Sequence, residues 1–455
     1  MDSRMQEDIL IVGAGPAGAS LAAFLGQNGN DQVQLVRHRF STEVIEVETV
    51  SDDLGTGYVC VVQDHITKHR FKIRAKYVFG ADGGRSHVAR SLDFNFSTTP
   101  GGARACNILI RADLGQLLPE KKQAGIHWLT QPERKNFAGV VAHLRVVRPW
   151  NEWVVVAFGP GGTNPFDGFT VKSPEIVDFV RELVGDHTID VKILQIDPWT
   201  VRESVADQFS NSDNSVFLVG DAAHRHPPTF GLGSNTCIQD AYNLAWKVAY
   251  VAKGLAGSAL LSTYSQERQP VGADLVRESN NQMRINSSIW DVLGMAVPCD
   301  EGVKQLEELT QPTAAGSNRR RRLHEAMELK RQELESLGIA HNQWYNTDAV
   351  YLHDEDAPRP VVESDPIVGV QISTYPGSRL PHVWLDNTGI PIVSYGIGHG
   401  QEYVDIRRDW FKKRGVGESG CVLVRPDRFV AWRSFEQPND CKKKLRGSLA
   451  EAYNI

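Results

Sequence analysis

The sequence has few cysteines and no large excess of either charge, and both shortages exclude classes of protein. Its six cysteines occur without CxxC or CxxH spacing, which argues against a zinc site and against the disulfide framework of a small secreted protein. The net charge is only -6 and the pI is near 6.2, so electrostatics gives no reason to expect nucleic acid or an anionic membrane as a partner. We therefore expect buried or incidental thiols and no metal site.

The sequence also lacks an uninterrupted apolar run long enough to cross a membrane. The stretch from Ile9 to Leu25 is largely apolar, but three glycines and a proline interrupt it. Asp2, Glu7 and Asp8 precede this stretch, where a signal peptide would be basic. These features predict a soluble, cytosolic protein without a membrane span. There is no internal repeat and no low-complexity tract.

What the sequence does contain is an alternation of strand-like and helix-like segments. A chain of 455 residues is long enough for about two or three domains. Residues 8–26, DILIVGAGPAGASLAAFLG, predict a short strand, a glycine-rich turn and a helix, which together begin a Rossmann-like unit. Residues 40–83 contain three β-rich runs whose spacing predicts an antiparallel meander.

A second, sheet-based domain is predicted in the middle of the chain. Residues 103–160 contain four strand-like runs, a helix follows at PEIVDFVRELVGD, and another strand follows at VKILQIDPWTV. We interpret this part as a domain inserted between two halves of the first domain, because a strand at SVFLVGDAAH and a long helix come next. The predicted division is residues 1–100 and 206–345 for the two parts of the first domain, 101–205 for the sheet domain, and 346–455 for a C-terminal domain.

The first motif with chemical meaning is the glycine turn IVGAGPAGAS. Gly13 permits a tight turn, Gly15 lets a pyrophosphate approach the backbone, and Gly18 allows the helix to contact the strand. Ala17 belongs to the same turn, and the helix N-terminus supplies the positive end of a dipole. A strand before the motif and a helix after it favour a dinucleotide site, although a turn without a ligand is the alternative.

The second motif is YVFGADGGRSHVAR, residues 77–90. A hydrophobic strand ends at Gly80, and Asp82, Gly83 and Arg85 then form a turn that leads into a helix. A binding site is one interpretation of this turn. An ordinary helix start with a capping aspartate is the other, and the motif alone does not decide between them.

The third motif is VFLVGDAAHRHPPTFGLGSNTCIQDAYNLAWK, residues 216–247. A strand leads to Gly220 and Asp221, and a rigid turn with Pro228 follows. An aspartate at a strand end can accept a hydrogen bond from a sugar-like hydroxyl, and amides at a helix N-terminus can hold negative charge on a ring carbonyl. The residues predicted to supply those amides are Gly231, Gly233, Ser234 and Asn235.

The three motifs, in this order and separated by a sheet-rich domain, resemble the FAD-dependent aromatic monooxygenases. The phenol and chlorophenol hydroxylase branch is similar in DPWTVRESVADQF and STYSQERQPVG as well, and in the tail segments PGSRLPHVWL and GCVLVRPDRFVAW. The resemblance implies an α/β (α+β) fold with a Rossmann-like FAD-binding domain, an inserted β-sheet substrate domain and a shortened thioredoxin-like C-terminal domain.

The resemblance also implies a cofactor, a reaction and a role for each motif. FAD would be bound, NADPH would be the co-substrate, and oxygen would be transferred to a small phenolic or aromatic substrate, as in other flavin enzymes where the cofactor carries the hard chemistry. The glycine turn would lie beside the FAD pyrophosphate, and Asp82 and Gly83 would serve FAD and NADPH binding. Asp221 would accept from the ribityl chain, with Pro228 beside the flavin ring and the amides near Ser234 at its pyrimidine edge. A homodimer is common in this branch.

One segment departs from the family pattern. Family members carry an acidic residue at the end of the second strand, where this chain has Val36 and Arg37 within QNGNDQVQLVRHRF. Either QVQLVR is that strand without its acid, or the strand and much of the segment after it are absent. The short separation of Gly18 from Asp82 favours the second interpretation. A similar shortening occurs after Asp386, so we hypothesise that coding segments were omitted by splicing or by an imperfect gene model.

The sequence does not identify a catalytic base. His127 and His226 are candidates for a substrate pocket, as is Trp128, but a lone histidine is more often satisfied within the structure and a strand tryptophan more often belongs to the core. Three functions are compatible with these features. The first is an NADPH- and oxygen-dependent flavin hydroxylase of phenols, the second is a shortened homologue that binds FAD poorly and is inactive, and the third is a flavin enzyme with a different reaction.

Overall fold

The computed structural model divides the chain into two compact units. Unit 1 comprises Met1–Ser97, Val205–Val276 and Glu335–Ile455, and unit 2 comprises Thr98–Ser204 and Arg277–Leu334. This division is coarser than the four predicted domains, whose boundaries stay a prediction. The structure describes residues 4–29, 38–52, 55–99, 102–118, 123–382, 386–387, 403–404 and 409–453.

The main sheet of unit 1 joins a parallel part to an antiparallel meander. Its strands follow the order β1-β4-β3-β2, and β12 pairs with β4. Strands β1 and β12 are parallel to β4, whereas β3 is antiparallel to both β4 and β2. The predicted meander is confirmed, and its last strand is also the central strand of the Rossmann-like part. The bounds are β1 (Arg4–Val12), β2 (Thr42–Asp52), β3 (Gly55–Asp64), β4 (Arg70–Gly80) and β12 (Val216–Leu218).

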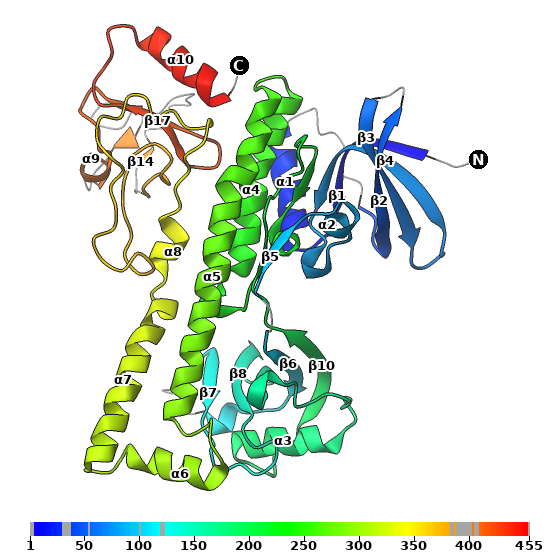
Figure 1. Cartoon of the computed structure of the whole chain (residues 1–455), viewed down its shortest axis with the longest axis vertical. Coiled ribbons are helices and arrows are strands. Elements are labelled where there is room, and N and C mark those ends of the chain that lie inside the picture. Colours follow the sequence, from blue (N-terminus) through cyan, green and yellow to red (C-terminus); the bar gives the residue numbers. More distant parts are fainter. Residues whose placement is uncertain are drawn as a thin grey trace. The chain divides into compact units, whose positions relative to one another are not determined.

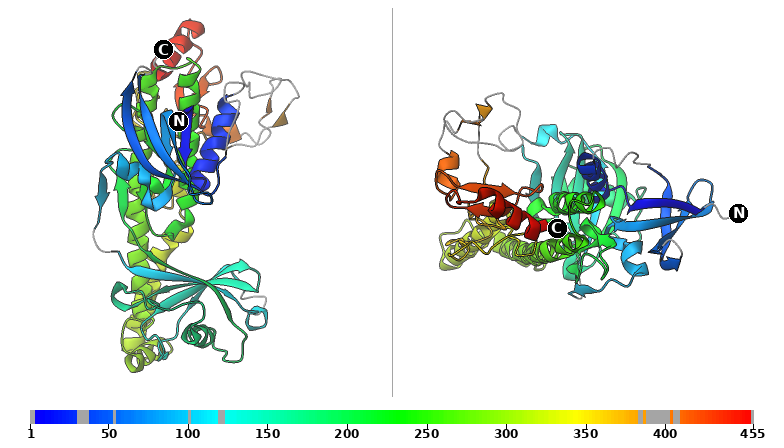
Figure 2. Two further views of the ribbon diagram at one scale, coloured as in Figure 1. Left: turned by 90° about the vertical axis from the view of Figure 1, so that its right-hand side faces the viewer. Right: turned by 90° about the horizontal axis from the view of Figure 1, so that it is seen from above.

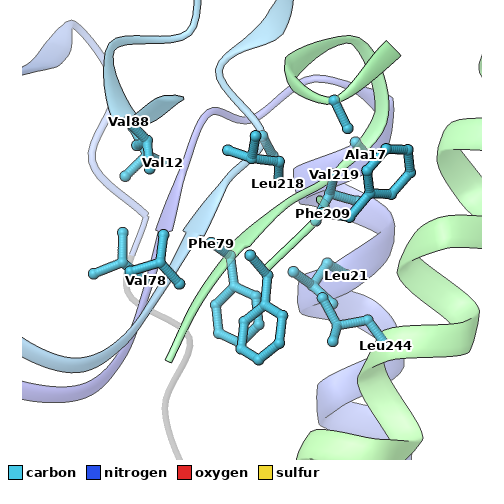
Figure 3. Close-up of a cluster of buried hydrophobic side chains, with 14 of the residues drawn as sticks. Val12, Ala17, Leu21, Val78, Phe79, Val88, Phe209, Leu218, Val219 and Leu244 are labelled. Atoms are coloured by element: carbon cyan, nitrogen blue, oxygen red, sulfur yellow. The ribbon is translucent and has the colours of Figure 1, made fainter. Parts of the chain in front are cut away.

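The core of unit 1 lies between this sheet and two helices. Val78 and Phe79 of β4 are fully buried, as expected for a strand flanked on both sides by parallel neighbours, and the Phe79 ring stacks on Phe217 with 5.3 Å between centroids. Leu21 of α1 (Pro16–Gly29) and Leu244 of α4 (Gly233–Ala252) pack into the same cluster (Figure 3). The two predicted helices are confirmed, and their small residues let them approach the sheet closely.

Unit 2 contains a second sheet, which is antiparallel throughout. Its order is β10-β6-β9-β8-β7, and α3 (Pro174–Val184) covers one face (Figure 2). The four buried side chains of α3, including Phe179, join the buried residues of that face in one core. Both the strands and the helix were predicted. The strand bounds are β6 (Arg104–Arg111), β7 (Ile126–Leu129), β8 (Val141–Arg148), β9 (Glu152–Phe158) and β10 (Lys192–Thr200).

The remaining elements are short strands and a series of helices (Figure 1). A small sheet has the order β13-β11-β5, and two two-stranded sheets pair β14 with β15 and β16 with β17. The tail ends in the β16-β17 hairpin and a helix, and its thioredoxin-like character stays a prediction. The bounds are α2 (His87–Ser91), β5 (Phe96–Thr98), β11 (Ser204–Ala206), β13 (His224–Arg225), α5 (Ser262–Val292), α6 (Cys299–Glu308), α7 (Ala314–Leu334), α8 (Leu337–His341), β14 (Asp386–Asn387), β15 (Tyr403–Val404), α9 (Asp409–Lys413), β16 (Cys421–Val424), β17 (Val430–Ser434) and α10 (Cys441–Tyr453).

None of the helices in the described ranges is both long enough and apolar enough to span a membrane.

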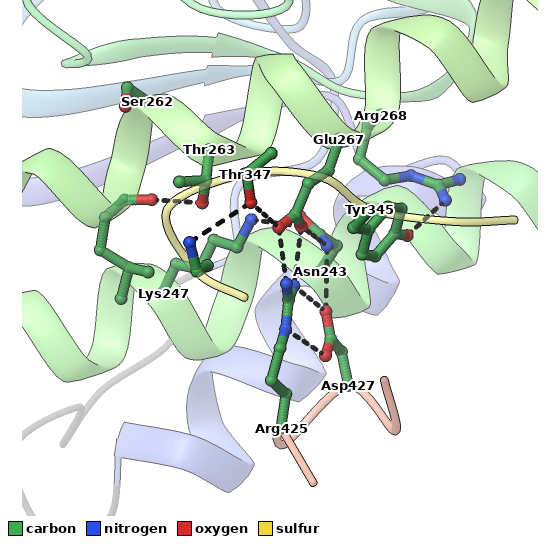
Figure 4. A network of polar contacts seen from close by, with 12 residues as sticks. Asn243, Lys247, Ser262, Thr263, Glu267, Arg268, Tyr345, Thr347, Arg425 and Asp427 are labelled. Atoms are coloured by element: carbon green, nitrogen blue, oxygen red, sulfur yellow. Dashed lines mark hydrogen bonds and ion pairs between the residues drawn. The ribbon is translucent and has the colours of Figure 1, made fainter. Parts of the chain in front are cut away.

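A buried group of charges ties the C-terminal segment to helices α4 and α5 within unit 1 (Figure 4). Both carboxylate oxygens of Glu267 accept from Arg425, at 2.6 and 2.7 Å, and one also accepts from Lys247 at 2.7 Å. All three side chains are fully buried. Asp427 accepts from Arg425, and Asn243 donates to both Glu267 and Asp427, which completes the group. Each charge therefore has a partner of opposite sign.

The electrostatics of this group follow from its burial. Burial alone would raise the pKa of Glu267, but Arg425 and Lys247 lower it below its usual range. Burial lowers the pKa of Lys247 to about 8, against the opposing effect of Glu267. Such a group stabilises a structure only while it is complete, because one removed partner leaves a buried charge unpaired.

Replacing Arg425 with Met leaves Glu267 buried without its bidentate partner. We expect the free energy of unfolding to fall by about 3–5 kcal/mol, the range for breaking a buried ion pair. Denaturant unfolding followed by tryptophan fluorescence measures this change. Arg321→Met is the matched control, because Arg321 pairs with Glu325 at the surface and an exposed pair contributes less than about 1 kcal/mol. Equal losses in the two variants would contradict the prediction.

Candidate functional site

Three turns meet at one edge of the unit 1 sheet because three parallel strands end there together. Val12 of β1 and Leu218 of β12 both pair with Gly80 of β4. Backbone hydrogen bonds continue one residue further, from Ala81 N to Val12 O at 2.8 Å and from Val219 N to Gly80 O at 2.9 Å. The three sequence motifs are thus adjacent at the carboxyl ends of their strands, where open α/β sheets bind ligands.

The glycine turn has the geometry that its sequence predicts. Gly13 has a φ of +105°, and a Cβ there would lie 2.2 Å from the carbonyl oxygen of Ala81. A Cβ on Gly18 would lie 2.0 Å from the carbonyl oxygen of Gly13, whereas one on Gly15 would meet nothing within 4 Å. Gly13 and Gly18 therefore close the turn, and Gly15 faces open space at the start of α1. The first turn of α1 carries no acidic residue, so its positive end is available to an anion.

The two carboxylate oxygens of Asp82, in the second motif, have different surroundings. Its Oδ2 accepts from the backbone amides of His87 at 2.7 Å and Val88 at 3.2 Å, which is the capping role that the alternative interpretation gives it. Its Oδ1 is also buried and has no hydrogen-bond partner among the described residues. Gly83 follows with a φ of +74°, and Arg85 is exposed. The cap thus uses one oxygen, and the other can accept from a bound ligand.

Gly220 and Asp221, in the third motif, lie beside the first turn. A Cβ on Gly220 would lie 2.7 Å from the sulfur of Cys237 and 3.0 Å from the Cβ of Ala17, so only glycine fits at its φ of +63°. The Asp221 side chain is exposed, and its Oδ1 lies 3.7 Å from the thiol of Cys237. Burial raises the pKa of Cys237 to about 12, so the thiol keeps its proton and donates toward the carboxylate.

The start of α4 presents uncapped backbone amides. Pro228 is exposed and ends the preceding turn, and α4 begins at Gly233 with neither a side-chain cap nor an acidic residue in its first turn. Ser234 and Asn235 are exposed at this end, and Gly231, with a φ of +66°, turns the chain into the helix. The amides of an uncapped first turn point toward whatever lies ahead of the helix, and they favour a negatively charged group.

The two histidine candidates lie in different units. His127 is on β7 of unit 2, where its ring meets Trp153 of the sheet core and its Nε2 bonds to the carbonyl of Ala124 at 2.9 Å. His226 is in unit 1, where its Nδ1 bonds to the Pro227 carbonyl at 2.7 Å. Burial lowers the pKa of His226, helped by the nearby His224. Each ring therefore already has a structural partner, and a catalytic role for either stays a prediction.

Trp128 points to the opposite face of the sheet from His127, as alternation along a strand requires. It pairs with His143 across the strands and stacks on Trp290 with 4.8 Å between centroids. Burial lowers the pKa of His143 to about 4, so this imidazole is neutral at physiological pH. Across the described ranges, no group of three or more metal-binding side chains is present.

Several residues that pack beneath the third motif were not predicted from the sequence. Cys237 and Asp240 lie on the face of α4 that packs under the Gly220 turn, and His224 and Arg268 bond to Asp240. The available signal was a histidine in the turn and an acid in the helix that follows it. It was not decisive, because only the fold brings Arg268 of α5 to the same point.

The residues present fit most of an FAD molecule but not all of it. The first turn fits a pyrophosphate, the free oxygens of Asp82 and Asp221 fit hydroxyl donors, and the start of α4 fits an anionic ring edge. The acid for the adenosine ribose has no counterpart in the described part of the chain, where β1 pairs with β4 alone. Val36 and Arg37 lie outside the described residues, as does the middle of the predicted junction, residues 30–37.

Comparisons with known proteins agree with this geometry. A family model described as "FAD binding domain" matches residues 34–279, more than half of the chain. The chain is 31% identical to 2,4-dichlorophenol 6-monooxygenase of Delftia acidovorans, an alignment that covers 92% of this chain and 76% of that protein. It is 35% identical to phenol 2-monooxygenase of Pseudomonas sp. (strain EST1001), covering 87% of this chain and 68% of that protein.

The first of these alignments also shows that this chain lacks internal positions that its relative has. The first spans 461 residues although only 92% of a 455-residue chain is aligned, so it contains positions that this chain lacks. The family match begins at residue 34, beyond the glycine turn. The shortening inferred between Gly29 and Ser41 stays a prediction.

A solved structure gives the same fold over the whole chain. The flavin-dependent monooxygenase PieE, solved with FAD and substrate, has a TM-score of 0.86 at 26% identity, and the match covers 100% of both chains. Aklavinone-11 hydroxylase has the same fold, with a TM-score of 0.67 at 22% identity and 92% of this chain covered. The predicted mixed α/β fold with a Rossmann-like FAD-binding part is confirmed. This chain belongs to the FAD-dependent aromatic hydroxylases, as an FAD-dependent monooxygenase.

Proposed function

We propose that this chain binds FAD at the three adjacent turns of unit 1 and hydroxylates a phenolic substrate with NADPH and oxygen. The observation that carries the proposal is the convergence of an open glycine turn, a free buried oxygen on Asp82 and an uncapped helix start at one sheet edge. Relatives named for the hydroxylation of phenol and of a dichlorophenol support the substrate class. The relatives favour this function over an inactive homologue or a different flavin reaction.

In this proposal the protein holds FAD at two places, its pyrophosphate at the start of α1 and its flavin ring at the start of α4. The amides at the start of α1 bind the pyrophosphate, and Asp221 accepts from a hydroxyl of the ribityl chain. The amides at the start of α4 hold negative charge on the pyrimidine edge of the ring, where Pro228 limits access by water. When bound, FAD supplies the redox chemistry that couples the oxidation of NADPH by oxygen to hydroxylation of the phenol. Gly83 and Arg85 face the same edge and are proposed to serve NADPH.

The adenosine end of FAD is proposed to be held less tightly than in longer relatives. An acid that accepts from the ribose contributes a charge-assisted hydrogen bond of roughly 1.5–3 kcal/mol, so its loss corresponds to about tenfold to a hundredfold in FAD affinity. The support for this proposal is that, within the described residues, β1 pairs with β4 alone, so no second strand brings an acid to its other side. A homodimer, common in the resembling branch, stays a prediction.

The decisive experiment combines spectroscopy with product analysis. Purified protein supplied with FAD is expected to show the visible absorbance of bound flavin, and a phenol is expected to accelerate NADPH oxidation and to appear as a hydroxylated product by mass spectrometry. A reaction without the phenol is the control. Bound FAD with NADPH oxidation but no hydroxylated product would contradict the hydroxylase, and a chain that takes up no FAD would contradict the cofactor site.

Asp221→Ala removes the proposed acceptor for the ribityl chain while leaving the backbone turn in place. We expect FAD affinity, measured by quenching of flavin fluorescence, to fall about tenfold to a hundredfold because a charged hydrogen bond is lost. Asp178→Ala, on an exposed face of α3, is the control and should bind FAD as the unaltered chain does. An unchanged affinity in Asp221→Ala would remove this residue from the site.

Gly13→Ala tests the close contact between the first two turns. The new Cβ would meet the Ala81 carbonyl at 2.2 Å at a strained φ, so the turn must shift, and we expect loss of FAD binding with a lower unfolding temperature. Gly26→Ala in α1, the helix that follows this turn, is the control, since a Cβ there meets nothing within 4 Å. That variant should gain up to about 1 kcal/mol from helix propensity. Similar behaviour of the two variants would contradict the packing argument.

A further inference from the structure

Asp240 is fully buried on α4, directly beneath the Gly220–Asp221 turn, and three different elements converge on it. Its Oδ2 accepts from the backbone amide of Gly220 at 3.2 Å and faces Nε2 of His224 at 2.9 Å. Its Oδ1 accepts from Nε of Arg268 at 2.8 Å. The side chains of His224 and Arg268 are also fully buried. One carboxylate thus joins the turn after β12, the strand β13 and helix α5.

We propose that Asp240 is a positioning residue for the flavin site, which fixes the Gly220–Asp221 turn by accepting from the Gly220 amide. The inference rests on the proposed function, because it assigns a purpose to a residue beneath the proposed FAD contact. Asp240 is not itself exposed and touches no ligand. It acts through the backbone that carries Asp221.

The surroundings of Gly220 explain why this one amide matters. The turn has no room to move sideways, since Cys237 and Ala17 lie within 3.0 Å of where a Cβ would be. The Gly220 amide points inward, away from the exposed side of the turn, and Asp240 is its acceptor. Without that acceptor, a buried amide would be left unsatisfied, and the turn would rearrange to reach another partner. Any such rearrangement moves Asp221, the next residue.

His224 and Arg268 restrict which side chain can replace Asp240 at position 240. The Nδ1 atom of His224 is buried and without a hydrogen-bond partner among the described residues, so the ring meets Asp240 through Nε2. The negative charge of Asp240 is balanced by Arg268, which also donates to Tyr345 and Gln343. Burial would raise the pKa of Asp240, but Arg268 and His224 lower it, so the carboxylate is ionised.

Asparagine at position 240 affects the three interactions of Asp240 differently. Its single oxygen can still accept from Arg268, but its amide nitrogen donates and cannot accept from Gly220. The Nε2 atom of His224 can accept from that nitrogen. The Gly220 amide has no comparable adjustment, and it alone loses its partner. Asp240→Asn therefore acts selectively on the turn.

The test compares Asp240→Asn with the unaltered chain by two measurements. FAD affinity, from quenching of flavin fluorescence, is expected to fall about tenfold or more, the effect of losing a hydrogen bond to a charged group. Hydrogen–deuterium exchange followed by mass spectrometry is expected to quicken in peptides covering residues 219–223 and not across unit 1 as a whole. Asp291→Asn is the control, because Asp291 pairs with Arg322 at the surface, and it should change neither measurement.

The outcomes separate the inference from the proposed function. A folded Asp240→Asn with unchanged FAD affinity, or with exchange quickened uniformly, would overturn the positioning role. If the unaltered chain binds no FAD, the proposed function fails, and exchange at residues 219–223 still decides the inference. If Asp240→Asn does not fold, Asp240→Glu keeps the charge and displaces it by one methylene. Normal FAD affinity and normal exchange in that variant would likewise overturn the role.

Discussion

The contact between the backbones of Gly13 and Ala81 is the constraint on which the rest of the site depends. Strands β1 and β4 end side by side, and the turn after β1 passes so close to the turn after β4 that a single added carbon would lie 2.2 Å from a carbonyl oxygen. Because of this approach, Gly18 can bring α1 down onto the same turn, and Ala17 can meet Gly220 of the third motif. The open position at Gly15 exists only because its neighbours are packed this closely.

Helix α4 connects this edge to the C-terminal segment through its buried polar face. Asp240 lies beneath the Gly220 turn, and Asn243 and Lys247 follow at helical spacing within the group around Glu267. Buried charges are costly unless they are paired, and both charges on α4, Asp240 and Lys247, find their partners on other segments. Arg268 and Arg425 come from α5 and from the tail. The start of α4, which faces the proposed flavin ring, is therefore held by residues far from it in the chain.

The two faces of the unit 2 sheet show why neighbouring residues in a motif can differ in purpose. His127 and Trp128 were considered together as candidates for a substrate pocket. Strand alternation sends His127 toward the core around Trp153 and Trp128 toward His143 and Trp290. His127 thus packs against the core of unit 2. A choice between them required the register of β7 on β8, which depends on partners distant in the sequence.

The sequence by itself determined the family, the order of the elements and the glycine, aspartate and helix-start residues of the three motifs. These features are local, because strand and helix periods, tight turns and helix N-termini are written in neighbouring residues. Only the tertiary structure decided that Asp82 keeps one oxygen free while capping α2, that Asp240 lies beneath the Gly220 turn, and that His224 and Arg268 share it. Those roles depend on distances between side chains from separate segments, and packing sets such distances without leaving a local pattern.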